Sequence, residues 1–247
     1  MSHLEYFKNR HTIRKYQSQE ISKEKLDEML AAAFHAPNTG NMQWYSVVVT
    51  CDENKKQELA PAHFNQPSVT GAAAVLTFCI DLNRFEHWCK INNAQPGFNN
   101  FQSFIAGIID TSIVAQQFCT IAELSGFGTC YLGTTAYNAP LIAEILKLPK
   151  RVVPVITVTV GLPLESEPQG ATTRIPAQAI IHYEQYQHPT DEDIRSYYKQ
   201  IEEESHKFVV ENAKETLAQV FTDVRYPKES AEHFSKIYQE FIKENEF

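Results

Sequence analysis

The sequence predicts a three-layer domain of the α/β or α+β class, in which helices alternate with only about four strands. Runs of β-branched and apolar residues predict strands at 46–50, 74–80 and 152–160, and a short strand or turn at 128–133. Segments with apolar residues at helical spacing lie between these runs. The chain has 247 residues, enough to bury roughly 70–75% of its unfolded surface.

The first well-defined helix is expected after Ser22, a favoured N-cap residue, and is expected to end at Pro37, because the residue before a proline avoids the helical region. Its apolar residues recur at helical spacing: Leu26, Met29, Leu30, Ala33 and Phe34. Residues 53–59 predict a short polar helix, and 92–100 predict a loop from their Asn, Pro and Gly content.

A central helix is predicted over 104–124, with apolar residues on more than one face and only Asp110 and Glu123 as charges. A helix that is apolar on most sides must be covered on most sides. The rest of the domain could supply this cover, and a subunit interface could do so equally well.

The second half of the chain begins with a helix that Asn138 and Pro140 start and that ends before Pro149. Residues 162–189 are long and irregular, and two helices are expected near 190–218 and 229–245. We find no internal repeat. We therefore expect one domain over 1–247, with a more polar C-terminal part from about residue 187.

Composition excludes several classes of partner. The formal net charge is −8, which argues against nucleic-acid or anionic-membrane binding, and the chain shows neither a signal peptide nor an apolar run of the roughly eighteen residues that a membrane span needs. The five cysteines are odd in number and have no pair at two-residue spacing, which excludes zinc-ribbon and thioredoxin-type signatures. Cys79 and Cys119 are expected to be buried thiols, and the chain to be cytoplasmic.

Two polar segments near the N-terminus suggest a ligand site. Arg10 and Arg14 lie one helical turn apart around His11 and Thr12, and offer two guanidinium groups and a hydroxyl to a phosphate. About twenty residues later, 36–44 offers amides and hydroxyls, with Gly40 allowing the backbone to approach a flat polar ring. Taken singly, the first segment is also typical of a solvated helix face and the second of a polar turn.

Together these segments resemble the flavin mononucleotide (FMN) site of the nitroreductase family, and more closely its larger, oxygen-insensitive NADPH-using branch. Two later segments are similar to family elements in the same order: 126–133, a glycine-rich turn and strand along the flavin, and 172–176, which returns a cation to its phosphate. The resemblance runs from about residue 5 to 186. It implies an α+β nitroreductase-like fold, with a mixed central β-sheet flanked by helices, as an intertwined homodimer with flavin at the interface.

The resemblance also implies a set of FMN contacts. Cations would hold the phosphate, Gln66 would reach the ring edge that accepts hydride, and 131–133 would offer backbone donors to the far side of the ring. His11 would serve the phosphate through its backbone or only pack. Thr172 stands where the family often carries lysine, so one charge is missing. The assigned residues are Arg10, His11, Thr12, Arg14, Asn38, Thr39, Gly40, Asn41, Gln66, Tyr131, Leu132, Gly133 and Arg174.

The implied reaction needs no catalytic side chain and no metal, because the cofactor carries the chemistry. NADPH would pass a hydride to FMN, and a nitroaromatic, quinone or free flavin would then take two electrons at the same place, in a ping-pong cycle. The related branch uses basic residues in its C-terminal excursion to meet the phosphate that distinguishes NADPH, so the resemblance implies that Arg225 and Lys228, on either side of a proline, favour NADPH over NADH. Such residues are also typical of a solvated surface.

Three alternatives stay open at this point. A flavin-binding protein without turnover would need the same phosphate residues, but NADPH would not bleach its yellow colour. An enzyme of the same fold could carry out another reductive reaction. In a thiol-dependent α/β enzyme the arginines would be structural, and the protein would be colourless. The physiological acceptor does not follow from the sequence.

Overall fold

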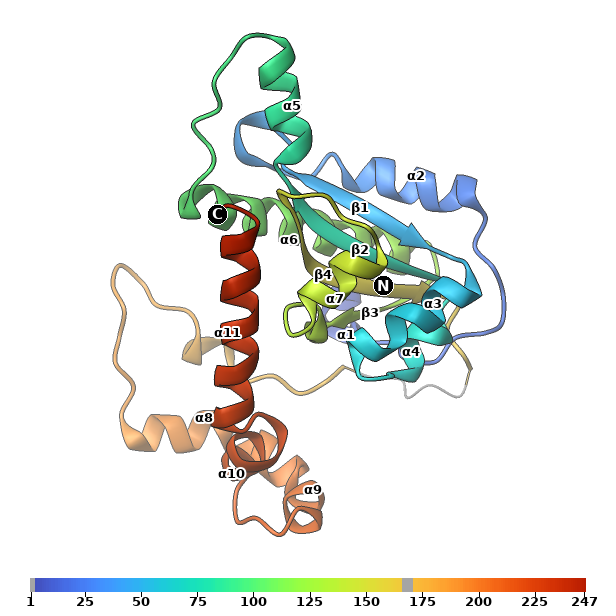
Figure 1. Ribbon diagram of the computed structural model, residues 1–247. Coiled ribbons are helices and arrows are strands. Elements are labelled where there is room, and N and C mark those ends of the chain that lie inside the picture. The colour runs from blue at the N-terminus through green and yellow to red at the C-terminus, as the bar shows by residue number, and fades with distance from the viewer. Residues whose placement is uncertain (1–2, 166–170) are drawn as a thin grey trace. The chain divides into compact units, whose positions relative to one another are not determined.

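The computed structural model describes residues 3–165 and 171–247, and the chain forms two compact units (Figure 1). The larger unit comprises Thr12–Pro168 and Phe234–Phe247. The smaller unit comprises Met1–His11 and Gln169–His233. The single domain expected over 1–247 stays a prediction.

The larger unit is built on a four-stranded sheet in the order β1-β2-β4-β3. The strands are β1 (Tyr45–Thr50), β2 (Ala74–Asp81), β3 (Gly128–Leu132) and β4 (Val152–Gly161). Neighbouring strands are antiparallel throughout the described residues, which corrects the expected mixed sheet. The connection from β1 to β2 begins and ends at the same end of the sheet, and so does the connection from β3 to β4. Each second strand therefore runs back alongside the first. Every residue of β2 is buried, Thr77 and Asp81 included, as the apolar and β-branched content of 74–80 predicts.

Helices α2 (Lys23–Ala33) and α6 (Phe101–Leu124) pack on one face of this sheet. Ser22 caps α2 as expected, its Oγ accepting from the Lys25 N–H at 3.2 Å. The helix ends at Ala33, before the expected stop at Pro37, because Phe34 already caps its last turn. Among the described residues α6 alone is long and apolar enough to cross a membrane, and a core helix on a sheet meets the same criterion.

The opposite face is covered by four short elements: α3 (Glu53–Leu59), the 3-10 turn η2 (Ala60–His63), α4 (Pro67–Thr70) and α7 (Ala139–Ile145). Leu59, Val69 and Ile142 are fully buried there against Val75 and Leu132 of the sheet. The larger unit therefore has the three layers that the sequence predicts, and the α+β class is confirmed.

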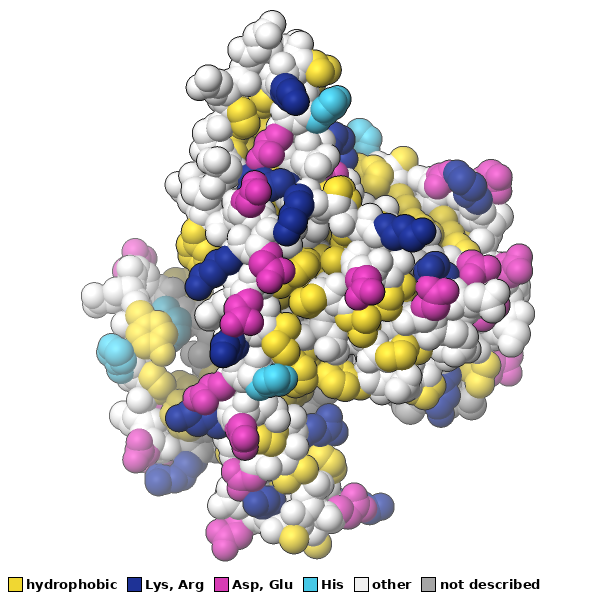
Figure 2. Space-filling view, viewed as in Figure 1, with side chains coloured by type: hydrophobic (Ala, Val, Ile, Leu, Met, Phe, Trp, Pro, Cys, Tyr) yellow, Lys and Arg dark blue, Asp and Glu magenta, His cyan; other side chains and the backbone are white. Residues whose placement is uncertain are grey.

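Two features of this unit were not expected. Helix α5 (Asn83–Ile91) follows β2 directly, and its start has no side-chain cap, so the sequence carries no start signal. The end of α11 (Lys228–Glu244) packs with Trp44 and Phe104 through Tyr238 and Ile242. Figure 2 shows acidic and basic side chains alternating along the exposed side of this helix.

The smaller unit contains α1 (His3–Asn9), the 3-10 turn η4 (Ala177–Ala179), α8 (Asp191–Glu204), α9 (His206–Glu211), α10 (Leu217–Val220) and a π-helical turn, η5 (Phe221–Arg225). The single helix expected over 190–218 is wrong, since the chain breaks at Ser205 and again over 212–216. The breaks allow Val209, Leu217 and Val220 to meet in one buried cluster. A straight helix could not bring these side chains together. Part of the irregular 162–189 segment, 166–170, lies outside the described residues.

Candidate functional site

The segment around Arg14 is fixed tightly to the start of β3. The Ile13 N–H donates to the Thr129 carbonyl at 3.1 Å, and the Tyr16 hydroxyl lies 2.7 Å from Thr159 Oγ1. A Cβ on Gly128 would lie 2.5 Å from that of Ile13, so only glycine permits this approach. Arg14 is therefore an exposed side chain on a rigid backbone between two anchored residues.

The opposite end of β3 carries the predicted ring contacts. Tyr131 and Leu132 are in the strand, and Gly133 begins the 3-10 turn η3 (Gly133–Thr135). A Cβ added to Gly133 would meet nothing within 4 Å. The backbone at Gly133 thus faces open space, which is the room that a flat ring needs to lie against it.

The loop that bears Gln66 is tied to this same turn. His63 Nδ1 lies 2.8 Å from Thr134 Oγ1, and Asn138 Nδ2 donates to the Ala62 carbonyl at 2.8 Å. Gln66 is the N-cap residue of α4, and its side chain is half-buried. Residues far apart in the sequence, Gln66 and Gly133, are therefore carried by two segments that are braced together.

Burial determines the protonation state of His63 in this brace. Its side chain is buried, and burial lowers the pKa of its imidazole to about 4. The neutral ring places one nitrogen on Thr134, and Nε2 has no partner among the described residues. The brace is therefore uncharged near neutral pH.

The segment 38–43 is held in an unusual backbone conformation. Gly40, Asn41 and Gln43 have φ values of 56°, 57° and 53°, a region that disfavours most residues but suits glycine and tolerates asparagine. The Gln43 N–H donates to Asn38 Oδ1 at 3.3 Å, which closes the segment on itself.

Asp110 on α6 anchors this segment. The Thr39 N–H donates to both carboxylate oxygens, at 2.9 and 3.1 Å, and the Thr39 hydroxyl donates to Oδ1 at 2.9 Å. Asp110 is only 1% exposed, so these bonds compensate a buried carboxylate. Both donors of Thr39 point into the protein, and Thr39 can offer a ligand only a lone pair.

This role of Asp110 does not follow from the sequence. An isolated acid in an otherwise apolar helix was visible in the sequence, but its partner is 71 residues away. The sequence marks Asp110 as unusual, but no residue near it in the sequence points to Thr39 as its partner.

Comparison with known proteins gives the chain its family. The model of the family described as "Nitroreductase family" matches residues 7–162. The chain belongs to the nitroreductase family. It is 30% identical to the FMN reductase (NADPH) of Bacillus subtilis (strain 168), over 76% of each chain. It is also 30% identical to the oxygen-insensitive NADPH nitroreductase of Salmonella typhimurium, over 76% of this chain and 75% of that protein.

Solved structures agree with this family. A protein from Bacteroides fragilis NCTC 9343 matches with a TM-score of 0.94 and 49% identity over 98% of both chains. The NADPH:FMN oxidoreductase from Vibrio harveyi, complexed with NAD+, matches with a TM-score of 0.79 and 27% identity over 97% of this chain and 96% of that one. The nitroreductase-like fold expected from the sequence is confirmed.

The remaining cations of the expected nitroreductase site lie in the smaller unit. Arg10 and His11 follow α1, and His11 Nδ1 lies 3.2 Å from the Asn9 carbonyl oxygen. Arg174 is exposed, and its neighbour Thr173 donates a hydrogen bond to Glu204. Thr12 and Arg14 belong to the larger unit. Joint binding of one phosphate by Arg10, Arg14 and Arg174 stays a prediction.

The two tail residues assigned to NADPH are exposed and have local partners. The Arg225 guanidinium lies over the Phe208 ring at 5.1 Å, a cation–π contact. Lys228 Nζ lies 3.6 Å from Glu232 Oε1 in a surface ion pair one turn along α11, a weak type of interaction. Both cations can leave these partners at small cost, and their NADPH role stays a prediction.

The cysteines fit the nitroreductase interpretation better than a thiol enzyme. Cys79 and Cys119 are fully buried, as expected. Cys51 is the exposed cysteine, and partial burial raises the pKa of its thiol. A raised pKa keeps the thiol protonated and opposes a nucleophilic role.

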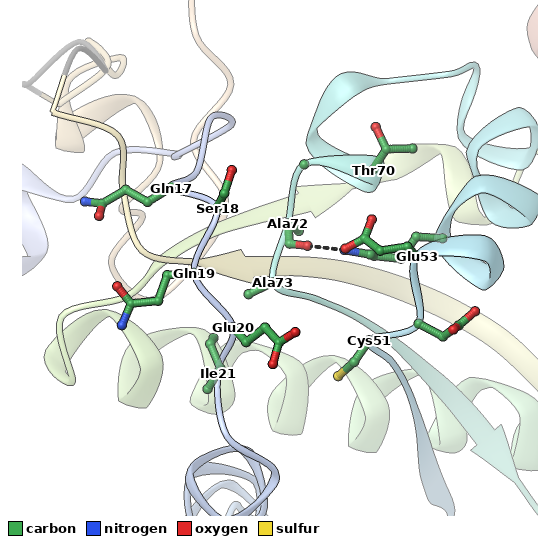
Figure 3. Close-up of a pocket in the computed structure, with 13 residues that line it drawn as sticks. Gln17, Ser18, Gln19, Glu20, Ile21, Cys51, Glu53, Thr70, Ala72 and Ala73 are labelled. Atoms are coloured by element: carbon green, nitrogen blue, oxygen red, sulfur yellow. Dashed lines mark hydrogen bonds and ion pairs between the residues drawn. The ribbon is translucent and has the colours of Figure 1, made fainter.

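A separate polar cavity of 720 Å³ lies between 17–21 and the start of β2 (Figure 3). Lys56 is buried at its wall, its Nζ donating to Glu53 Oε1 at 2.7 Å and to the Ala72 carbonyl at 2.6 Å. All residues that line this cavity lie outside the positions assigned to FMN. The cavity and the candidate flavin site are therefore different places.

Proposed function

We propose that this chain is an FMN-dependent oxidoreductase that takes a hydride from NADPH and passes two electrons to a small aromatic acceptor. The acceptor would be a nitroaromatic, a quinone or free flavin, and the two half-reactions would alternate at one site. NADH is a possible second donor. The relatives named above as an FMN reductase and an NADPH nitroreductase support this assignment.

One structural observation carries the proposal. Strand β3 has the Arg14 segment fixed at its start, through Ile13 and Thr129, and the Gly133 turn with the braced Gln66 loop at its end. The side chain that we propose for the phosphate and the backbone that we propose for the ring therefore lie at opposite ends of one five-residue strand. This is the arrangement that an elongated molecule with a phosphate at one end and a flat ring at the other requires.

The residues present fit FMN. Bound FMN would supply hydride acceptance and electron release. Arg14, with Arg10 and Arg174, would bind the phosphate through charge-assisted hydrogen bonds. The backbone at Gly133 and the amide of Gln66 would orient the ring, and donors near its edge would stabilise negative charge there. Asp110 would keep Thr39 and the following Gly40 and Asn41 in place.

We further propose a homodimer. Phe101, Ile105 and Ile109 form a row on α6 at four-residue spacing and are 65%, 40% and 52% exposed. Such a row on a core helix is the kind of surface that a second copy covers.

The net charge of −8 supports the absence of a nucleic-acid or membrane partner, and we propose a cytoplasmic location.

The deciding experiment is an absorption spectrum of the purified protein with and without NADPH under argon. The proposal expects a yellow protein whose flavin absorption NADPH bleaches. A yellow protein that NADPH leaves unchanged would support a flavin-binding protein without turnover. A colourless protein that cannot be loaded with FMN would contradict both.

A further inference from the structure

Phe64 has a left-handed backbone conformation that costs free energy, and its side chain is not buried enough to offset that cost. It has φ 53°, and Asn65 after it also has φ 53°. A bulky side chain in the left-handed region is a genuine outlier, and such strain clusters at functional sites. Its ring is 52% exposed, so burial recovers only part of the cost. Glycine would fit this backbone more easily and could not supply a ring.

Hydrogen bonds of Phe64 and of its neighbours hold this conformation, and the Phe64 N–H itself donates to the Pro61 carbonyl at 3.1 Å. The Asn65 N–H donates to the Ala60 carbonyl at 2.8 Å. The brace already described adds His63 Nδ1 to Thr134 Oγ1 and Asn138 Nδ2 to the Ala62 carbonyl, both at 2.8 Å. The backbone on both sides of Phe64 is thereby fixed, which sets the direction of its Cα–Cβ bond.

Two further rings support Phe64 from inside the same unit. Tyr137 and Phe234 stack at 4.8 Å with 12° between their planes. Phe64 stands edge-on to both, with centroids 6.3 Å from Tyr137 and 5.9 Å from Phe234. Tyr137 and Phe234 are half-buried, so the exposed part of the cluster is mainly Phe64. Figure 2 shows hydrophobic side chains gathered on the surface beside α11, the helix that carries Phe234.

The position of this ring relates it to the proposed reaction. Phe64 precedes Gln66 by two residues, and the brace through Thr134 joins its loop to the turn that begins at Gly133. The exposed ring therefore belongs to the structure that carries both proposed contacts with the flavin ring system.

We infer that Phe64 is the docking face for the ring of the electron acceptor, and that it sets a preference for planar π systems over compact inorganic oxyanions. This inference rests on the proposed oxidoreductase function. An aromatic ring presents a face and an edge of opposite polarity, and a second ring can stack on it or meet it edge-on. A tetrahedral oxyanion has neither surface and gains nothing from the contact.

The test isolates the oxidative half-reaction. The enzyme is reduced with one equivalent of NADPH under argon and mixed with nitrobenzene or with chromate, and the return of oxidised flavin absorption is followed by stopped flow. The variants are Phe64→Ala and Phe64→Leu. The control is Trp88→Ala, since Trp88 is 59% exposed on α5 and lies tilted against Phe85, with ring centroids 5.7 Å apart, outside the proposed site.

The inference expects the half-saturating nitrobenzene concentration to rise about threefold to tenfold in both Phe64 variants, from the usual size of an aromatic pair contact. Chromate should change less than twofold, Trp88→Ala should behave as wild type, and Phe64→Tyr should restore nitrobenzene binding. Phe64→Leu keeps an apolar side chain against Tyr137 and Phe234. It therefore still tests the role of the ring if Phe64→Ala does not fold.

Two outcomes would overturn the inference: unchanged nitrobenzene saturation in Phe64→Leu, or an equal rise for chromate. Failure of NADPH to bleach the wild-type flavin is a separate result, because it removes the proposed oxidoreductase function itself. Bleaching of all variants with unchanged nitrobenzene saturation removes only the role of Phe64.

Discussion

Asp110 accepts hydrogen bonds from both donors of Thr39: the N–H is shared between the two carboxylate oxygens, and the hydroxyl donates to Oδ1. The pair joins the central helix α6 to the left-handed segment that begins at Gly40. Neither residue needs to touch a ligand for this link to matter, because the conformation of 39–41 depends on it.

The first prediction tests this link. Asp110→Ala removes the acceptor of the Thr39 N–H and hydroxyl, and because Thr39 is exposed and water can take the place of the carboxylate, we expect a cost of about 0.5–1.5 kcal/mol for each lost hydrogen bond. We expect a lower urea midpoint and at least partial loss of bound FMN. Thr39→Val removes only the hydroxyl and should cost about 1 kcal/mol. Glu28→Gln, on an exposed ion pair with Lys25, is the matched control and should change neither quantity.

The second prediction concerns the phosphate. Removing Arg14 deletes a charge-assisted hydrogen bond worth roughly 1.5–3 kcal/mol, so Arg14→Ala should weaken FMN binding at least about tenfold. Fluorescence titration of the apoprotein with FMN measures this, with circular dichroism to show an intact fold. Arg195→Ala on α8 serves as the control. Unchanged flavin occupancy after Arg10→Ala and Arg14→Ala together would refute the phosphate assignment.

Local signals predicted much of the fold. Ser22 was identifiable as a cap, and the limits expected for the helix 53–59 match α3. Helix α5 was missed because Leu82, at its N-cap position, offers no capping side chain. The segment 190–218 is broken into separate helices so that Val209 can pack against Leu217 and Val220. The helical spacing of apolar residues does not reveal such packing between segments.

Less of the candidate site could be predicted from the sequence, because here too the decisive contacts join residues that are far apart in the chain. Residue types that bind phosphate or approach a ring are recognisable in a short motif. The contacts that orient them join distant positions, such as His63 with Thr134 and Asn138 with Ala62, separated by 71 and 76 residues. The left-handed backbone at Phe64 carries no glycine to signal it.

The third prediction concerns assembly. A charge in the exposed row of α6 should prevent a second copy from covering it, because burying an unpaired carboxylate costs several kcal/mol. Ile109→Glu should therefore shift sedimentation at micromolar protein from about twice the chain mass, as expected for the wild type, to the monomer. Val49→Glu, on the exposed side of β1, is the control. A wild-type monomer that holds FMN would contradict the homodimer.

The fourth prediction is a pH dependence from His63. Its pKa in the fold is lowered from 6.5 to about 4 by burial, so between these values the unfolded chain binds the proton and the folded chain does not. The stabilisation is complete above pH 6.5 and is lost as the pH falls toward 4. The loss amounts to about 3 kcal/mol.

Urea unfolding at pH 7 and pH 4 measures this difference. His63→Gln can keep the contact with Thr134 but does not titrate, so it should lose about 3 kcal/mol less stability than the wild type between the two pH values. His87→Gln, at an exposed position on α5, should lose as much as the wild type. Equal losses in wild type and His63→Gln would show that His63 does not carry the effect.

The last prediction concerns the choice of nicotinamide. Arg225 rests on Phe208 in an exposed cation–π contact, worth only about 0.5–1 kcal/mol. The extra phosphate of NADPH offers a bidentate, charge-assisted partner worth more than that. Arg225→Ala should therefore raise the KM for NADPH several-fold and leave the KM for NADH nearly unchanged. Lys228→Ala should have a smaller effect of the same kind, because an ammonium meets the phosphate as a point charge. Lys207→Ala, on the exposed side of α9, is the control. An equal change in the KM for NADPH and for NADH, or no change in either, would show that Arg225 and Lys228 are ordinary solvated surface residues.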